Sequence, residues 1–218
     1  MRGLWLTMLV ALPLASLADD DDIEKVNGSI DIAADQKAGD LSTVNGSIRI
    51  KAGAIVEEAE TVNGSIALGE RGAAESLETV NGTIKMETDA RVTESVHTVN
   101  GSVTLGRNAD VKGGIRTVNG DIRLDAAHVA GGIRTQEGDI EVGGGSRVEG
   151  GIHVEKKSGG FSISLFKSTP RIVIGPGAVV QGELTFEREV ELFVSETATV
   201  GPIKGATPVR FSGPEPSD

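Results

Sequence analysis

The chain of 218 residues carries 32 acidic and 21 basic residues, has a net charge of −11 and contains no cysteine. An acidic surface repels phosphate backbones, which argues against nucleic acid as a partner, and a chain without cysteine has no disulfide cross-links. Aromatic residues make up only 3% of the chain and none is tyrosine, which disfavours an aromatic-lined ligand pocket.

The N-terminal residues 1–18 have the pattern of a secretory signal peptide. Arg2 supplies the positive start, Leu4 to Leu14 form an apolar run, and small residues up to Ala18 provide a cleavage site. The run is shorter than the roughly 20 apolar residues of a membrane-spanning helix. We therefore expect an exported protein of the periplasm, cell surface or extracellular space, without a transmembrane segment after cleavage. An uncleaved N-terminal anchor is the alternative. An acidic segment, residues 19–25, follows.

A short phrase recurs along the next part of the chain. "TVNGSI" at Thr43–Ile48 recurs unchanged at Thr61–Ile66. Variants follow, and the last of them is a degenerate copy, "TQEGDI", at Thr135–Ile140. The marker residues, Asn in six copies and Glu in the last, are spaced by 18 or 19 residues: Asn27, Asn45, Asn63, Asn81, Asn100, Asn119 and Glu137. A fixed period of this length is typical of a solenoid, in which stacked units bury a shared core.

Each unit alternates apolar and polar residues as a strand does. In the second unit, Val44, Ile48 and Ile50 alternate with Asn45, Ser47 and Arg49, and the aliphatic residues are expected to form inward columns. A second phrase, as in "LGRNADVKGGI" at Leu105–Ile115, completes each unit. We predict an all-β, single-stranded parallel β-helix of about nine coils over residues 26–204. We favour a right-handed coil because the aliphatic spacing is uneven.

The Asn-Gly pair is interpreted as a corner between two strands. Both residues tolerate left-handed backbone geometry, and glycine also lets neighbouring backbones approach closely. Stacked asparagines can form a hydrogen-bonded ladder if the column points inward. The predicted structural ladder consists of Asn27, Asn45, Asn63, Asn81, Asn100 and Asn119 with Gly28, Gly46, Gly64, Gly82, Gly101 and Gly120.

Two stretches interrupt the pattern. Residues 155–170, with the alternating letters "FSISLF", are an insertion that adds a strand or loop beside the stack. Residues 205–218 are rich in proline and are predicted to be a disordered tail.

Two resemblances follow from these phrases. The units "TVNGSIRI", "TVNGDIRL" and "TQEGDIEV" behind a leader resemble the secreted adhesin-type family of bacterial β-solenoid domains, over Val26–Val154. "IGPGAVVQGEL" at Ile174–Leu184 is similar to the coils of bactofilins, which are polymer-forming scaffold proteins. The resemblances imply a solenoid rod that adheres or assembles.

No residue set in the sequence predicts a catalytic centre, cofactor or metal. The five Asn-x-Ser/Thr sequons are explained by coil geometry. Only Asp121 and Asp139 match the aspartates of calcium-binding repeats, which need many more such residues. His97 and His153 lie three coils apart, too far to share a zinc ion, and His128 occupies another part of its coil.

One outward column changes sign along the axis, from acid to base: Ser42, Glu60, Glu78, His97, Arg116, Arg134 and His153. Such a gradient would favour head-to-tail contacts between copies. We also expect an uncapped N-terminal coil, so that self-association through the solenoid ends, or an envelope protein or polysaccharide partner, would cover it.

The sequence thus predicts an exported, non-enzymatic adhesin-like or scaffold module of the bacterial cell envelope. The alternative is a carbohydrate-active enzyme or lectin, which would require carboxylates, or a carboxylate and arginine, close together on adjacent coils.

Overall fold

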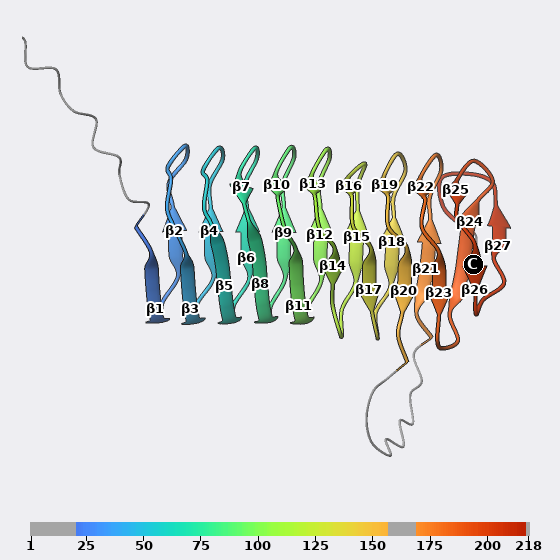
Figure 1. Cartoon of the computed structure of the whole chain (residues 1–218), viewed down its shortest axis with the longest axis horizontal. Helices are drawn as coiled ribbons and strands as arrows, with labels where there is room; N and C mark the ends of the chain where they lie inside the picture. Colours follow the sequence, from blue (N-terminus) through green and yellow to red (C-terminus); the bar gives the residue numbers. More distant parts are fainter. Residues whose placement is uncertain (1–20, 157–168, 217–218) are drawn as a thin grey trace, which may run out of the picture.

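The computed structural model describes residues 21–156 and 169–216, and these form a parallel β-solenoid (Figure 1). The predicted signal peptide and the "FSISLF" stretch of the insertion lie outside the described residues. The described chain contains strands and turns but no helix, so none of it forms a helix that could cross a membrane. The elongated stack has three walls, named sheets A, B and C below.

Sheet A contains the first strand of each coil. Its members, in stacking order, are β1 (Ile23–Asn27), β3 (Leu41–Asn45), β5 (Glu58–Asn63), β8 (Ser76–Asn81), β11 (Val96–Asn100), β14 (Ile115–Arg116), β17 (Ile133–Thr135), β20 (Ile152–Val154), β23 (Leu184–Phe186) and β26 (Ile203–Lys204).

Sheet B follows the Asn-Gly corner. Its members are β2 (Ile30–Ile32), β4 (Ile48–Ile50), β6 (Ile66–Leu68), β9 (Ile84–Met86), β12 (Val103–Leu105), β15 (Ile122–Leu124), β18 (Ile140–Val142), β21 (Arg171–Ile174), β24 (Glu191–Ser195) and β27 (Val209–Phe211).

Sheet C closes each coil with two-residue strands. Its members are β7 (Ala73–Ala74), β10 (Arg91–Val92), β13 (Asp110–Val111), β16 (His128–Val129), β19 (Arg147–Val148), β22 (Val179–Val180) and β25 (Thr199–Val200). Bridges between Lys37 and Ile55 and between Ile55 and Ala73 continue this wall toward the N-terminus.

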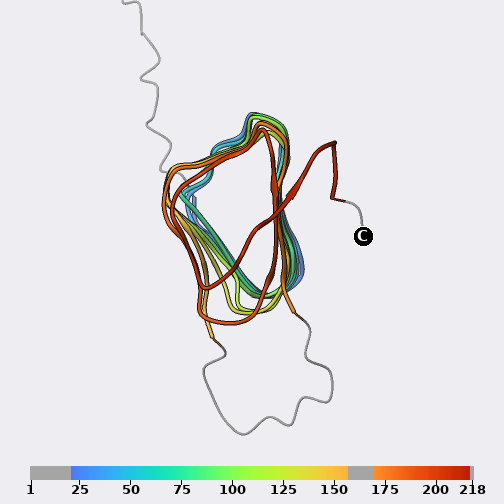
Figure 2. The same cartoon turned by 90° about the vertical axis from the view of Figure 1, so that its right-hand side faces the viewer.

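The coil is right-handed, as predicted. Seen from the C-terminal end, where it winds toward the viewer, the chain runs down sheet A on the left and up sheet B on the right (Figure 2). Sheets A and B each contain ten strands, which gives about nine complete turns.

The core consists of aliphatic columns that run along the axis. Ile48 pairs in register with Ile66 and Ile66 with Ile84, and all three side chains are fully buried. Sheet C adds a valine column in which Val92, Val111 and Val129 are successive neighbours. Because each side chain stacks on its equivalent in the next coil, the core is continuous from one end of the stack to the other.

The solenoid is longer at both ends than the predicted residues 26–204. β1 begins at Ile23, which pairs with Leu41, so part of the acidic segment 19–25 belongs to the first coil. At the other end, residues 205–208 lead across the open end of the last coil to β27 (Figure 2). The prediction of a disordered tail from residue 205 is therefore wrong for these residues. β27 pairs in parallel with β24, and Phe211, opposite Ser195, is buried.

The expected uncapped N-terminal coil ends in unpaired backbone rather than in an apolar surface. Ile30, Ile32 and Leu41 are at most 2% exposed. Among the described strands, β1 and β2 each have one neighbour, and these three side chains are covered, so unpaired backbone rather than apolar surface is found at this end.

Candidate functional site

The predicted corner residues form a ladder on the outside of the solenoid. The side-chain amide of each asparagine donates a hydrogen bond to the amide oxygen of the one before it, from Asn45 to Asn27 at 3.1 Å through to Asn119 to Asn100 at 2.9 Å. These asparagines are exposed, so the column does not point inward. The bonds tie successive coils together along the rim and use the side-chain NH2 groups of four of the five sequon asparagines, Asn45, Asn63, Asn81 and Asn100.

The glycines of this corner are needed mainly for close packing. A Cβ on Gly64 would lie 1.9 Å from the carbonyl oxygen of Gly46, and Gly46, Gly82 and Gly101 meet the preceding coil in the same way. Of the six predicted glycines, only Gly28 and Gly120 have positive φ angles. Left-handed residues occur instead in the turn before sheet C, at Asp35, Gly53, Arg71, Asp89, Asn108, Ala126, Gly145 and Gly177.

The side chains that flank the corner are reversed relative to the prediction. Thr43 is buried and Val44 is exposed, because alternation along β3 starts from buried Leu41. The three-residue corner then resets the alternation, so that Ile48 is again buried. As a result the outer face of sheet A carries an apolar column that the sequence pattern assigned to the core.

This valine column comprises Val26, Val44, Val62, Val80, Val99 and Val118. Val26 is 68% exposed, and the next four are between 39% and 41% exposed. Single exposed aliphatics are common on proteins, but an aligned row of them on one sheet makes this face a candidate interaction surface.

A charge column runs beside the valines, two residues earlier in each strand. The backbone register confirms the predicted order and extends it at both ends: Glu24, Ser42, Glu60, Glu78, His97, Arg116, Arg134, His153, Thr185 and Lys204. The fixed charges are negative on the N-terminal side of His97 and positive on its C-terminal side.

The two columns line one open groove on sheet A, from Ser42 to Val118. Within it, the His97 ring lies 3.2 Å from the Glu78 carboxylate, and Arg116 lies 3.8 Å from Glu155. Beside the acidic half, desolvation and then the carboxylates of Asp40 and Glu60 raise the pKa of Glu58. Glu60 and Glu78 line this end of the groove, which is therefore acidic.

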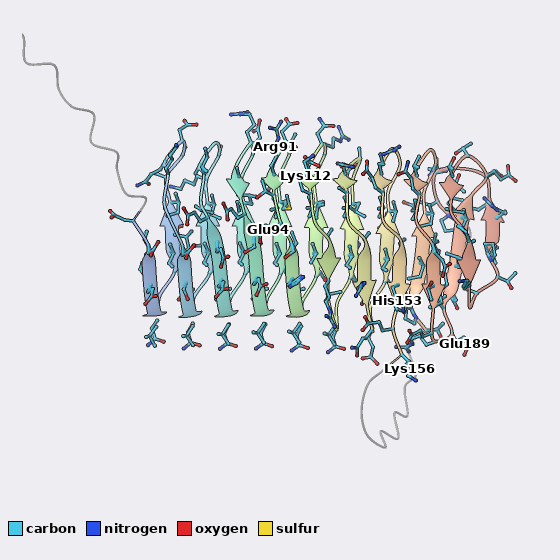
Figure 3. The ribbon with its side chains drawn as sticks, in the orientation of Figure 1. Arg91, Glu94, Lys112, His153, Lys156 and Glu189 are labelled. Carbon is cyan, nitrogen blue, oxygen red and sulfur yellow. The ribbon has the colours of Figure 1, made fainter. Side chains whose placement is uncertain are left out.

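Sheet C carries a second polar surface, in which Arg91, Asp110, His128 and Arg147 are successive outward neighbours. The Nδ1 atom of His128 lies 2.6 Å from Asp110 and its Nε2 atom 3.3 Å from Glu149. Lys112 lies 2.8 Å from Asp110. Arg91 and Lys112 are labelled in Figure 3, at the edge of the stack near β10.

The electrostatics of this surface suit ion pairing. Burial raises the pKa of Asp110, but hydrogen bonds with Lys112 and His128 outweigh this effect and hold the pKa below its usual range. A general acid needs the opposite shift, so that it still carries a proton near neutral pH.

The two aspartates that match calcium-binding repeats, Asp121 and Asp139, make hydrogen bonds within the solenoid. The Asp121 carboxylate accepts a hydrogen bond from the backbone N–H of Asp139, whose own carboxylate accepts one from Arg171. Within residues 21–156 and 169–216 no group of three or more His, Asp or Glu side chains could hold a metal ion. His97 and His153 share a column and lie three coils apart.

The sequence predicted one of the two columns that line the groove, the charge column, but not the outward position of the valine column. The charge column follows directly from the repeat spacing. The valine column was assigned to the core because valine is apolar. Strict alternation along the strand from buried Leu41 would have placed it on the outer face.

Comparison of the chain with protein-family models, curated proteins and solved structures finds no match.

Proposed function

We propose that this protein is an exported, non-enzymatic interaction module of the bacterial cell envelope, and that the outer face of sheet A is its working surface. The observation that carries the proposal is the groove in which an exposed valine column runs beside a charge column of changing sign. A long face of this kind suits an extended or protein partner better than a small molecule, which binds in an enclosed cavity. The signal-peptide pattern of residues 1–18 supports export.

The proposal is tested by retention of the purified, exported protein on cell-wall and outer-membrane fractions. Val80→Lys places a charge in the middle of the groove, whereas Ala67→Lys places the same charge on the outer face of sheet B. We expect Val80→Lys to lose retention and Ala67→Lys to keep it. Equal retention of the two folded variants would show that this face is not the contact surface.

The carbohydrate-active alternative draws support from one feature. On sheet C, His128 contacts both Asp110 on the coil before it and Glu149 on the coil after it, and Arg147 lies beside Glu149. Two carboxylates therefore lie near each other, although they are two coils apart rather than on adjacent coils. The low pKa of Asp110 and the pairing of Glu149 with both Arg147 and His128 favour a surface ion-pair network instead. Polysaccharide cleavage by the wild type that Asp110→Asn abolishes would reverse this preference.

A further inference from the structure

The charge column of sheet A has a symmetry that the proposed function does not use. Counted in coils from His97, Glu78 and Arg116 lie one coil away on opposite sides, and Glu60 and Arg134 lie two coils away. Ser42 and His153 occupy the third positions. Each acidic position on one side therefore has a basic or neutral counterpart at the same distance on the other.

We propose that sheet A binds sheet A of a second copy of this chain, with the two solenoids antiparallel and the twofold axis passing at His97. The proposal rests on the assignment of this face as the working surface. In this dimer Glu78 faces Arg116 of the second copy, and Glu60 faces Arg134 of the second copy. The symmetry repeats both contacts, so one column supplies four acid–base pairs.

The direction of the second copy follows from the same column. A twofold axis parallel to the solenoid axis would keep the coil order and place Glu60 against Glu60 and Arg134 against Arg134. A twofold axis along the strands reverses the coil order and places opposite charges together. Like charges held face to face are strongly unfavourable, so the pattern selects the antiparallel dimer.

The four charged side chains that would pair across the dimer are not held in buried ion pairs among the residues that the structure describes. Glu60 and Arg134 have no ion-pair partner within the described part of the chain. Among the described residues, Glu78 pairs with His97 and Arg116 with Glu155, and the side chains of Glu78 and Arg116 are 46% and 50% exposed. Exposed ion pairs contribute little, so these contacts are easily exchanged for pairs across an interface that excludes water.

The valine column adds apolar contact at the centre. Val99 lies on the rung of His97 and would meet Val99 of the second copy, while Val80 would meet Val118 of the second copy. Nine overlapping rungs spaced by about 4.8 Å, with strands of two to six residues and so about 14 Å long on average, give a face of about 600 Å² per copy. This approaches the roughly 800 Å² per partner of a standard protein interface.

Charge reversal in analytical ultracentrifugation tests the proposal. We expect the wild type to dimerise as its concentration rises. The pair Glu60→Arg/Glu78→Arg and the pair Arg116→Glu/Arg134→Glu should each weaken self-association by at least about tenfold, because they create like-charge contacts. Mixing the two variants should form a heterodimer, and combining all four changes in one chain should restore the homodimer.

The matched control is Lys85→Glu/Arg123→Glu, which makes the same change of charge on the outer face of sheet B. It should dimerise like the wild type. Val99→Lys tests the centre independently, since it brings two lysines together at the twofold axis, and it should also give monomers. Circular dichroism and thermal melts check that each variant remains folded.

Two results would overturn the dimer. A wild type that stays monomeric at all concentrations excludes it, and so does a dimer that is indifferent to the four charge reversals, as expected for association through the solenoid ends. Neither result decides the proposed function. That depends on whether Val80→Lys loses envelope retention that Ala67→Lys keeps.

Discussion

The hydroxyl of Thr61 donates a 2.9 Å hydrogen bond to the carbonyl oxygen of Gly46 in the coil before it. The same bond joins Thr43 to Gly28, Thr79 to Gly64 and Thr98 to Gly82. Threonine therefore occupies an inward position of an otherwise aliphatic interior because its hydroxyl satisfies the carbonyl group that the tight glycine corner turns toward it. The neighbouring valine is left outside.

Thr79→Val tests this column. The replacement keeps the shape of the side chain but removes the donor to Gly64, and we expect the free energy of unfolding to fall by about 1 kcal/mol. Urea denaturation measures the change. The control is Val80→Thr on the exposed side of the same strand, where we expect a change within about 0.5 kcal/mol. Equal effects of the two substitutions would contradict the assigned orientation of the strand.

Gly64→Ala tests the close approach of neighbouring coils. The added methyl group would lie 1.9 Å from the Gly46 carbonyl oxygen, and neither backbone can move without disturbing the stack. We expect a loss of about 3 kcal/mol in the free energy of unfolding. At Gly144 the nearest atom to an added methyl group is 3.2 Å away, so Gly144→Ala should cost clearly less. A Gly64→Ala protein as stable as Gly144→Ala would show that the corner has room.

Asn63→Ala tests the external ladder. Asn63 donates to Asn45 and accepts from Asn81, so the substitution removes two hydrogen bonds. Because the ladder is exposed, we expect a modest cost of about 1 kcal/mol. Asn27, at the end of the ladder, has one such bond, so Asn27→Ala should cost about half as much. Thermal denaturation of both variants checks the order, and a larger loss for Asn27→Ala would contradict it.

Asp110 should contribute a pH-dependent part of the stability. Its pKa is lower in the folded protein than in the unfolded chain, so its stabilising effect is present above the unfolded pKa and is lost as the pH falls through the folded value. We therefore expect Asp110→Asn to be less stable than the wild type at neutral pH. The difference should shrink below about pH 4. Urea denaturation at both pH values measures it, and a gap that stays constant or widens in acid would contradict the ion-pair assignment.

Much of the architecture could be predicted because it depends on repetition. The 18- and 19-residue spacing of the asparagines is enough to place Ile48, Ile66 and Ile84 in one column, and the structure confirms that register. The same spacing predicts the order of the charge column. The ends were less predictable, because β27 joins sheet B by pairing with β24 although residues 205–211 carry no recognisable copy of the repeat phrase.

By itself, then, the sequence determined the period, the stacked coils and which residues are equivalent along the axis, since equivalent positions must share one environment in a stack. Only the tertiary structure decided which of two adjacent columns faces the core. Hydrophobicity favours valine inside, but the carbonyl groups of the glycine corner need a buried donor, and threonine provides it. That single choice of orientation turns Val62, Val80 and Val99 outward and creates the groove through which the protein is proposed to act.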